Sequence, residues 1–390
     1  MTSWLIITVI ITSALLVPLA VVIWNILGWR RVTAVDATSP QPLVSVLIPA
    51  RNEAANLPAC IAAVQQQGAV VAEIIVLDDH SHDRTAAVVR QLKPTEPRLQ
   101  LITGQSLPDG WVGKCWACQQ LGAAATAEWL LFLDADARLV PGAIAGMLSV
   151  AKKLRLSMLS CWPGFSLHSF WEQLLMPLLN FLTFTLYPAP LALLRMSDAS
   201  LGLAHGACLL LRRGDYLALG GHRVVKHELF EDTRLARAWR ASGRRSLGLD
   251  GQDVVRVRMY QSLPQIWVGF EKNFYPAFKQ PLGFALFLGV HVALFLLPFP
   301  LVVVALAAGS PALLLWLSFA ACSMVLAMRL LLAWRFQHPY WSALLHPLGE
   351  LLLVTIALNS WWRVASGRGV RWKGRSYLGA TSSGKQDHRQ

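Results

Sequence analysis

The sequence predicts an α/β domain with a mostly parallel sheet, flanked by transmembrane helices at both ends of the chain. Between residues 42 and 278, short apolar runs that end in polar residues alternate with helical segments, which is the pattern of a sheet covered by helices. Long apolar segments lie on either side of this region. The whole chain is 55% hydrophobic and only 15% charged, so its composition is too apolar for an ordinary soluble enzyme.

Residues 1–29 are predicted to form an N-terminal transmembrane anchor. The segment from Trp4 to Gly28 carries no charge and exceeds the roughly 20 apolar residues that a spanning helix needs. Arg30 and Arg31 follow directly, and the positive-inside rule then places the next part of the chain in the cytoplasm. No small-residue cleavage site follows the segment, so we expect an uncleaved anchor and not a signal peptide.

Two strand–helix pairs come next. The run LVSVLIPARNEAANLPACIAAV predicts a buried strand, a turn at residues 49–52 and a helix with Glu53 in its first turn, where the helix dipole favours a carboxylate. Residues 73–77 form the next predicted strand, which stops at Asp78 and Asp79. A helix is expected to begin near residues 83–85.

Three further elements continue the alternation: a strand at Leu99–Thr103, a helix over residues 114–125 and a strand at Trp129–Leu133. Parallel strands end at one edge of a sheet, and α/β sheets bind ligands in the crevice beyond that edge. Polar side chains follow three of the predicted strand ends, namely Arg51, Asn52 and Glu53, then Asp78 and Asp79, then Asp134 and Asp136. The sequence therefore predicts a binding site where these three segments converge.

Asp134 and Asp136 are expected to hold a divalent metal ion. They follow the apolar run WLLFL, and a carboxylate at a buried strand end is costly unless a positive partner is present. Mg²⁺ and Mn²⁺ prefer oxygen ligands, and a nucleotide diphosphate fits the same edge with the metal joining carboxylate and phosphate oxygens. The alternative is a solvated acidic pair at the surface.

Five motifs in this region resemble those of membrane-anchored family 2 glycosyltransferases with the GT-A fold: SVLIPARNEA, VLDDHSHDRT, GWVGKCWACQQL, LFLDADARL and ELFEDTRLARAWRASGRR. The resemblance covers about residues 42–278. It implies a UDP-sugar donor, with Asp79 reading the uracil or ribose, at a site formed by Pro49, Arg51, Glu53, Asp79, Lys114 and Asp134. It also implies that Asp134 and Asp136 hold Mg²⁺ or Mn²⁺ with the diphosphate. Asp232 is then the catalytic base of an inverting transfer that forms no covalent sugar–enzyme intermediate.

The assignment of the base has competitors in the sequence. Glu231 and Asp232 also fit the N-terminal charges of a helix, and only one of the two needs to face the cleft. Glu228 is the nearest alternative carboxylate, although its position fits the motif less well. His205, in the HGACLLL run, is expected to be structural.

The region from 165 to 194 interrupts the domain with an apolar, aromatic stretch that three prolines break. We expect it to form helices in the membrane interface beside the acceptor site, with an ordinary buried insert as the alternative. Residues 256–278 and the segment GVRWKGRSY resemble bacterial glycosyltransferases that glucosylate hydroxylated carotenoids, and the Gln-x-x-Arg-Trp signature of processive polysaccharide synthases is replaced. The resemblance implies transfer of one hexose to the hydroxyl of a membrane lipid, a carotenoid or another polyisoprenoid. A ceramide-like lipid, a sterol, a hopanoid or a polysaccharide stays open as the acceptor.

Residues 282–362 are predicted to hold three apolar helices, at about 282–308, 311–334 and 341–362, and residues 363–390 a basic tail. The last helix contains His346, Glu350 and Asn359, so a re-entrant or tilted arrangement stays open for it. If all four apolar segments cross, both termini lie outside, whereas the basic tail favours the cytoplasm. We expect an integral protein of a bacterial cell membrane with the globular domain in the cytoplasm.

Other classes of protein fit the sequence less well. The formal net charge of +13 does not indicate a nucleic-acid partner, because many of the basic residues flank apolar segments and do not gather in one stripe. A transporter with a nucleotide-binding regulatory domain is the alternative class, and few intramembrane charges and no evident inverted repeat count against it. A nucleotidyltransferase would have no use for Asp232.

Overall fold

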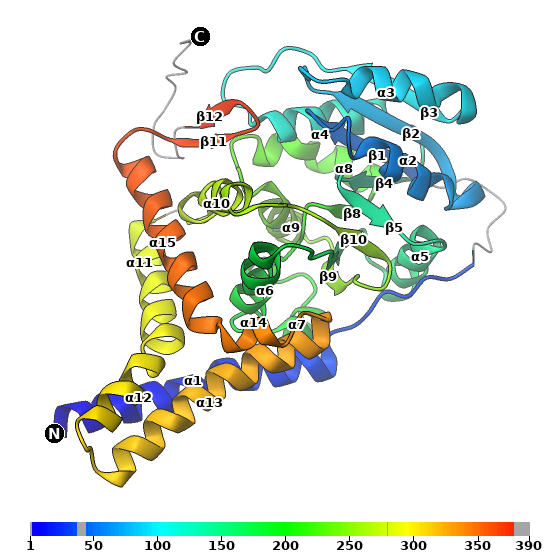
Figure 1. The fold of residues 1–390 in the computed structure, drawn as a ribbon. Coiled ribbons are helices and arrows are strands. Elements are labelled where there is room, and N and C mark those ends of the chain that lie inside the picture. The colour runs from blue at the N-terminus through cyan, green and yellow to red at the C-terminus, as the bar shows by residue number, and fades with distance from the viewer. Residues whose placement is uncertain (1, 37–43, 279, 378–390) are drawn as a thin grey trace. The chain divides into compact units, whose positions relative to one another are not determined.

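The computed structural model describes residues 2–36, 44–278 and 280–377, which divide into two compact units (Figure 1). The described residues of the first unit lie in the ranges 2–29, 167–190 and 260–377, and those of the second in the ranges 30–166 and 191–259. The predicted start of the α/β domain at residue 42 and the end of the predicted basic tail lie outside the described residues.

The second unit is built around a seven-stranded sheet with the strand order β3-β2-β1-β4-β8-β6-β9. Strand β8 runs antiparallel to its neighbours β4 and β6, and the other pairings in this sheet are parallel. The predicted mostly parallel sheet is therefore confirmed. The strands are β1 (Val44–Ala50), β2 (Val71–Asp78), β3 (Leu99–Thr103), β4 (Trp129–Leu133), β6 (Met158–Trp162), β8 (Cys208–Arg212) and β9 (Ser246–Asp250).

Helices alternate with the first strands of this sheet, as the sequence pattern predicts. The helices of the second unit are α2 (Leu57–Gln65), α3 (Thr85–Leu92), α4 (Gly113–Ala124), α5 (Ala143–Leu154), α8 (Arg213–Leu219) and α9 (Glu231–Ala241).

A second, smaller sheet has the strand order β5-β10-β7. Its strands are β5 (Ala137–Leu139), β7 (Gly164–Phe165) and β10 (Val255–Val257).

Two local predictions near β1 are wrong. The strand continues through Pro49 to Ala50, so the turn begins later than residue 49. Strand β4 pairs with β1 only as far as Leu47, so the missing N–H of Pro49 breaks no bond of that ladder. Helix α2 begins at Leu57 with Pro58 in its first turn, where proline is favoured. Glu53 therefore precedes the helix, and its carbonyl accepts hydrogen bonds from the N–H groups that close the intervening turn.

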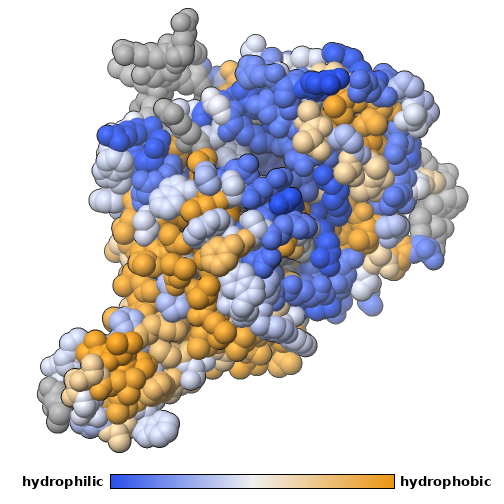
Figure 2. All heavy atoms as spheres, in the orientation of Figure 1, coloured by the Kyte–Doolittle hydropathy of each residue, from blue (hydrophilic) through white to orange (hydrophobic). Residues whose placement is uncertain are grey.

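The first unit contains two described helices that are long and apolar enough to cross a membrane, α1 (Thr2–Gly28) and α13 (Ala312–Phe336). They lie side by side, and the hydroxyl of Thr12 donates to the carbonyl of Leu317 at 3.3 Å (Figure 1). Large apolar side chains of both helices are exposed. Figure 2 shows hydrophobic residues gathered over α12 and α13, a patch of the kind that marks contact with lipid or with another protein.

The three apolar helices predicted in residues 282–362 differ in the structure in how continuous they are. A π-helical turn at His291–Leu296 joins helices α11 (Pro281–Val290) and α12 (Pro298–Ala307). This run is bent by 43°, and it is a third candidate span if the bent pair crosses the membrane as one. The predicted helix at 341–362 is divided into α14 (Trp341–Leu344) and α15 (His346–Ala365). Helix α15 is not among the described helices that are long and apolar enough to be candidate spans. Pro347, in the first turn of α15, marks the break between α14 and α15.

Carboxylates in the apolar helices of the first unit have partners. Glu350 on α15 is fully buried, and its Oε1 lies 2.6 Å from Nδ1 of His291. Glu172 on α6 (Phe170–Phe184) is also buried, and it completes a capping box with Ser169 at the start of that helix. These contacts meet the requirement that a buried carboxylate be paired or hydrogen-bonded.

Residues 167–190 and 260–278 belong to the first unit, together with the apolar helices. The α/β unit therefore ends at residue 259, earlier than the expected boundary at 278. The first of these segments contains α6 and the start of α7 (Ala189–Leu194), and the second contains α10 (Leu263–Glu271). The basic tail is in part a hairpin of two strands, β11 (Val370–Trp372) and β12 (Arg375–Tyr377).

Candidate active site

The site lies at one edge of the large sheet, where the central parallel strands end. Strand β1 lies between β2 and β4, and the pairing of β1 with β2 continues to the last residue of each strand, Ala50 opposite Asp78. The N–H of Asp79 then donates to the carbonyl of Ala50 at 2.8 Å. The sequence segments that follow these three strands are therefore neighbours, as the alternating pattern predicts.

The loops after β1 and β2 are held together by hydrogen bonds. Nη1 of Arg51 donates to the carbonyl of Asp79 at 2.6 Å and to that of His80 at 3.3 Å. The N–H of Asn52 donates to the hydroxyl of Ser81 at 2.9 Å. Asn52 and His80 both have left-handed backbones, with φ values of 56° and 54°. Such strain in non-glycine residues persists only where the surroundings fix it, and it concentrates at functional sites.

The predicted donor-site residues on these two loops come together in the structure. Asp79 is buried at 7% exposure, beside the guanidinium contacts of Arg51. The N–H of Glu53 donates to the hydroxyl of Thr85 at 2.9 Å, so the loop after β1 is also fixed to the start of α3. Pro49 lies one residue before the end of β1, opposite Leu77 in the register.

Asp134 and Asp136 lie in the turn between β4 and β5 and are both half-buried. The N–H of Ala137 donates to the carbonyl of Asp134 at 3.0 Å, which closes the turn. The carboxylate of Asp134 already has a cationic partner, because Nζ of Lys114 lies 2.9 Å from its Oδ1 and 3.1 Å from its Oδ2. Lys114 is at the first turn of α4, as the sequence predicts.

Lys114 connects the end of β4 to the start of α9. Its Nζ also lies 3.2 Å from Oε1 of Glu231, so one ammonium group bridges two carboxylates from distant parts of the chain. Burial would lower the pKa of Lys114, but the charges of Asp134 and Glu231 outweigh it and hold that pKa well above its usual value. Lys114 is therefore charged at neutral pH.

Asp232, the predicted base, is next to this ion-pair cluster. Its Oδ2 accepts a hydrogen bond from the N–H of Gly206 at 2.7 Å, and its Oδ1 accepts one from the N–H of Thr233 at 2.6 Å. Burial, followed by the negative charge of Glu231, raises the pKa of Asp232 from 3.8 to about 7. A carboxylate with this pKa can accept a proton near neutral pH.

The competing carboxylates have other partners. Glu231 is buried at 8% exposure and pairs with Lys114, while Oε2 of Glu228 lies 3.6 Å from Nε of Arg234. Both contacts agree with the preference for Asp232 that the motif gave. The role of Glu231 as the second partner of Lys114 is not visible in the sequence, because it depends on the packing of α4 against the start of α9.

Gly206 is a site residue that the sequence analysis missed. A Cβ atom added to it would lie 3.0 Å from Nζ of Lys114 and 3.2 Å from Oδ2 of Asp232. Its N–H also holds Asp232, and a Cβ atom here would force Lys114 or Asp232 to shift by a few tenths of an ångström. The HGA sequence beside the β8 strand is the one local signal that could have pointed to it.

His205 packs within a buried aromatic wall. Its ring centroid lies 5.1 Å from that of Trp162 and 6.3 Å from that of Phe165. Burial lowers the pKa of His205 to about 4, so the ring is neutral at pH 7. The hydroxyl of Ser160 accepts from the N–H of His205 and donates to its carbonyl. These contacts support the structural role that was predicted.

The site therefore combines an acidic turn, a bridging lysine and a carboxylate of raised pKa at the ends of the parallel strands. Residues 45–218 match the protein-family model described as Glycosyl transferase family 2, so this part of the chain is a family 2 glycosyltransferase domain. The family assignment predicted from the motifs is confirmed.

Two of the proteins similar to this chain come from staphylococci. The chain is 30% identical over 222 residues to a protein named 4,4'-diaponeurosporenoate glycosyltransferase from Staphylococcus haemolyticus (strain JCSC1435), a match that covers 56% of this chain and 57% of the relative. The chain thus spans little more than half the length of that relative. A protein of the same name from Staphylococcus aureus (strain USA300) is 25% identical over 354 residues, which cover 86% of this chain and 88% of the relative.

Similarity to a solved structure extends over most of the chain. The mannosyltransferase PcManGT from Pyrobaculum calidifontis, in complex with GDP-Man and Mn²⁺, has a TM-score of 0.57 at 19% sequence identity. The match covers 92% of this chain and 99% of the mannosyltransferase. This likeness concerns the fold, and it confirms the predicted GT-A fold.

Proposed function

We propose that this protein is an inverting glycosyltransferase that moves a single hexose from a UDP-sugar to a membrane lipid, a carotenoid or another polyisoprenoid. The observation that carries the proposal is the cluster of Lys114, Asp134, Glu231 and Asp232 at the strand-end edge, which places a cation and a proton acceptor side by side. The relatives named 4,4'-diaponeurosporenoate glycosyltransferase support a lipid acceptor.

The joined loops after β1 and β2 are the proposed binding surface for the nucleotide. Arg51 donates hydrogen bonds to the backbone carbonyls of Asp79 and His80, and these bonds orient the loop after β2. Asp79 is then positioned to accept hydrogen bonds from the base or ribose, while Lys114 faces the diphosphate. A loop pair that is rigid before binding loses little conformational freedom when the donor binds.

Asp134 and Asp136 would hold Mg²⁺ or Mn²⁺ together with the diphosphate. Among the described residues, no group of three His, Cys, Asp or Glu side chains is close enough to hold a metal ion, so diphosphate oxygens and water would supply the other ligands. The ion pair with Lys114 indicates that the Asp134 carboxylate accepts a cation at this position. When bound, the metal supplies electrostatic stabilisation of the departing diphosphate.

Asp232 takes the proton from the acceptor hydroxyl in this proposal. Two backbone N–H groups fix its carboxylate, and each oxygen keeps a lone pair that can receive the proton. A single base is sufficient for direct displacement at the anomeric carbon, which inverts its configuration. Lys114, between Glu231 and Asp134, couples the position of the base to the position of the diphosphate site.

The proposed base bears on whether the acceptor group is a hydroxyl or a carboxylate. The relatives' name ends in -oate, which denotes a carboxylate, and a carboxylate is already ionised at neutral pH and needs no base. A hydroxyl does need one, and an Asp232 with a pKa of about 7 favours a hydroxyl acceptor. A carboxylate acceptor is the second candidate, and it predicts a rate that does not depend on the ionisation of Asp232.

The proposed location is a bacterial cell membrane with the α/β unit in the cytoplasm. Helices α1 and α13 are the candidate spans, and Arg30 and Arg31 directly after α1 favour a cytoplasmic position for the α/β unit. A cytoplasmic position also gives the site access to nucleotide sugars.

Lipid mass spectrometry tests the function. Cells that carry the gene are compared with cells in which it is deleted and with deletion cells that express the Asp232→Asn variant. We expect one hexose-bearing lipid to disappear on deletion, to return with the wild-type gene and to stay absent with the variant. Loss of a long polysaccharide with no change in any hexosyl lipid would refute single transfer to a lipid.

A further inference from the structure

His205 lies in a short segment that connects the two halves of the proposed site. The N–H of its neighbour Gly206 donates to Oδ2 of Asp232 at 2.7 Å. The carbonyl of Ala207 accepts the N–H of Asp134 at 3.0 Å. Transfer requires the acceptor hydroxyl to lie close to the anomeric carbon, which is bonded to the diphosphate. The donor hexose therefore has to lie between the proposed diphosphate turn and the proposed base, beside this segment.

The imidazole of His205 carries its hydrogen on Nε2. Nδ1 accepts the backbone N–H of Ala207 at 3.3 Å, and a ring nitrogen that accepts a hydrogen bond carries no hydrogen. Burial lowers the pKa of His205 to about 4, so the ring is neutral at pH 7 and its one N–H is at Nε2. The side chain therefore offers a hydrogen-bond donor without a charge.

This N–H is open to a ligand. Among residues 2–36, 44–278 and 280–377, no group accepts a hydrogen bond from Nε2 of His205. The residue is 8% exposed, and Nε2 is not one of the fully buried nitrogen and oxygen atoms of these residues that lack a partner. The atom therefore keeps contact with the surroundings of the site. Polar groups in such mostly buried positions are normally hydrogen-bonded, so Nε2–H is suited to an oxygen atom of a ligand.

Neighbouring side chains fix the direction of the N–H. The ring centroid of His205 lies 5.1 Å from that of Trp162 and 6.3 Å from that of Phe165. After burial, the charges of Asp134 and Lys114 have the next largest effects on the pKa of His205, so the ring lies near the proposed diphosphate site. A donor group that is held in place before binding loses little conformational freedom when the ligand binds.

We propose that Nε2–H of His205 donates a hydrogen bond to a hydroxyl oxygen of the donor hexose and so contributes to the selection of the sugar. The inference rests on the proposed function and adds a sugar contact to the residues that hold the nucleotide and the metal ion. A neutral donor suits a hydroxyl, whereas the charged Lys114 suits the diphosphate. The acceptor hydroxyl offers the same chemistry as a sugar hydroxyl, so the test has to separate these two sources.

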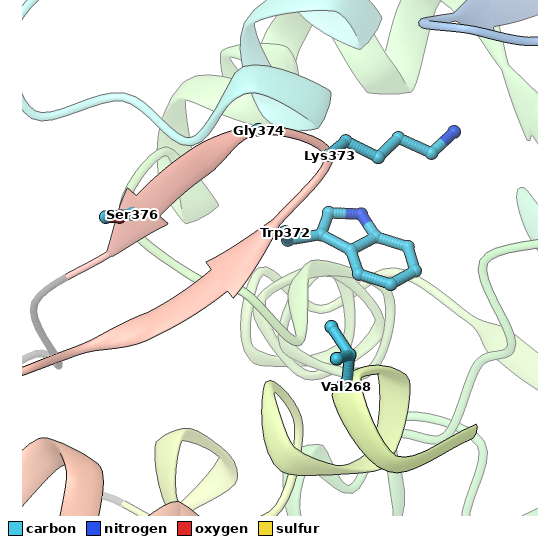
Figure 3. A pocket seen from close by; sticks show the side chains of 5 residues that line it. All are labelled: Val268, Trp372, Lys373, Gly374 and Ser376. Atoms are coloured by element: carbon cyan, nitrogen blue, oxygen red, sulfur yellow. The ribbon is translucent and has the colours of Figure 1, made fainter. Parts of the chain in front are cut away.

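A cavity of about 330 Å³ in the first unit is a second place where a sugar could bind (Figure 3). It lies between α10 and the hairpin of β11 and β12, and its lining residues are Val268, Trp372, Lys373, Gly374 and Ser376. Nζ of Lys272 lies 3.8 Å from the ring centroid of Trp372, so one face of this indole is already covered. The hexose contact is therefore assigned to His205, and the cavity is the comparison site in the test.

The test uses the full chain in a mild non-ionic detergent, with UDP and UDP-glucose as probes. In His205→Asn the amide oxygen can take the place of Nδ1 and accept the N–H of Ala207, but no atom reaches the position of Nε2. In His205→Gln the amide nitrogen can reach the position of Nε2, but the acceptor at the position of Nδ1 is lost. The two variants therefore separate the proposed sugar contact from the hydrogen bond that holds the ring.

Two further variants are controls. His222→Asn removes another buried imidazole, whose Nδ1 lies 2.8 Å from the hydroxyl of Tyr216. Ser376→Ala removes the hydroxyl that lines the cavity of the first unit. Both controls are expected to bind UDP and UDP-glucose as the wild type does.

Calorimetry without acceptor lipid measures the outcome. We expect His205→Asn to bind UDP-glucose about fivefold more weakly than the wild type, the effect of losing one neutral hydrogen bond, and to bind UDP with unchanged affinity. His205→Gln is expected to bind UDP-glucose within about twofold of the wild type. It should melt at a lower temperature than His205→Asn, because the N–H of Ala207 has lost its acceptor. A purely structural role would give the weaker UDP-glucose binding to the less stable variant.

Other results would overturn the proposal. Equal losses of affinity for UDP and UDP-glucose in His205→Asn, or no loss for either probe, show that Nε2 makes no sugar contact. Unchanged UDP-glucose affinity with a raised KM for the lipid in the transfer assay assigns Nε2 to the acceptor. Weaker UDP-glucose binding in Ser376→Ala, with His205→Asn unaffected, assigns the hexose to the cavity of the first unit. A wild-type protein that binds neither probe refutes the proposed donor and this inference with it, whereas the other results leave the proposed function standing.

Discussion

Asp232 is the proposed catalytic base, and its replacement by Asn separates proton acceptance from binding of the donor. In Asp232→Asn the side chain keeps its size but cannot accept the acceptor's proton, so we expect turnover to fall by roughly two to four orders of magnitude, the contribution of a positioned general base. Binding of UDP should be unchanged, because the Asp232 carboxylate is held by the N–H groups of Gly206 and Thr233, which lie outside the loops after β1 and β2.

The pH dependence follows from the pKa of about 7. Only the ionised form of Asp232 can act as the base, so about a tenth of the wild-type enzyme is active at pH 6 and about nine-tenths at pH 8. The value of kcat/KM, which reports the ionisation of the free enzyme, should therefore rise roughly tenfold over this interval and level off above it. The residual rate of the Asn variant should show no such rise.

The stability of the variant is the control for folding. The folded protein binds a proton at Asp232 more tightly than the unfolded chain does, since the pKa rises from 3.8 on folding. Ionisation of Asp232 thus lowers the stability of the fold as the pH rises from 3.8 to about 7, and Asn removes that cost at pH 8. Asn can accept only one of the two backbone N–H bonds that Asp232 accepts, a loss of about 1 kcal/mol. The two effects oppose each other, and the ionisation cost is the larger because a shift of about three pKa units corresponds to about 4 kcal/mol, so we expect the Asn variant to melt no lower than wild type at pH 8.

The assay is single-turnover transfer of radiolabelled hexose to lipid, with Glu228→Gln as the matched carboxylate control. Near-normal turnover in Asp232→Asn together with a large loss in Glu228→Gln would show that the base is assigned to the wrong residue. A flat pH profile in the wild-type enzyme, with the Asn variant still impaired, would instead favour the carboxylate acceptor.

Three further predictions concern other parts of the molecule. The double variant Asp134→Ala and Asp136→Ala should lose the dependence of UDP binding on Mg²⁺ or Mn²⁺ in calorimetry, and an unchanged metal response would refute the metal assignment. Gly206→Ala should lower turnover by at least about tenfold with the fold intact by circular dichroism, because its Cβ would displace the base and the bridging lysine. Glu350→Ala should lower the melting temperature in detergent, by an amount equivalent to about 1–3 kcal/mol, because it leaves the imidazole of His291 buried without its partner; a melting temperature equal to wild type would show that the pair does not stabilise the first unit.

Local sequence patterns determined the order of the elements in the α/β unit. Strands β3 and β4 lie at their predicted bounds, because short apolar runs between polar residues are a direct signal for buried strands. The convergence of Arg51, Asp79 and Asp134 at one edge also followed from the sequence, since parallel strands end together. The exact start of α2 could not be predicted from the apolar pattern, because it is set by Pro58 and by the turn after Glu53.

Only the tertiary structure shows which charged side chains of the site pair with one another. Nothing in the sequence shows that Lys114 bridges Asp134 and Glu231, or that the N–H of Gly206 holds Asp232, because these contacts join segments that are far apart along the chain. The pairing of Glu350 with His291 in the first unit is likewise a contact between distant segments. Periodicity and composition report which residues are buried, but the partner of a buried charge depends on the packing of one element against another.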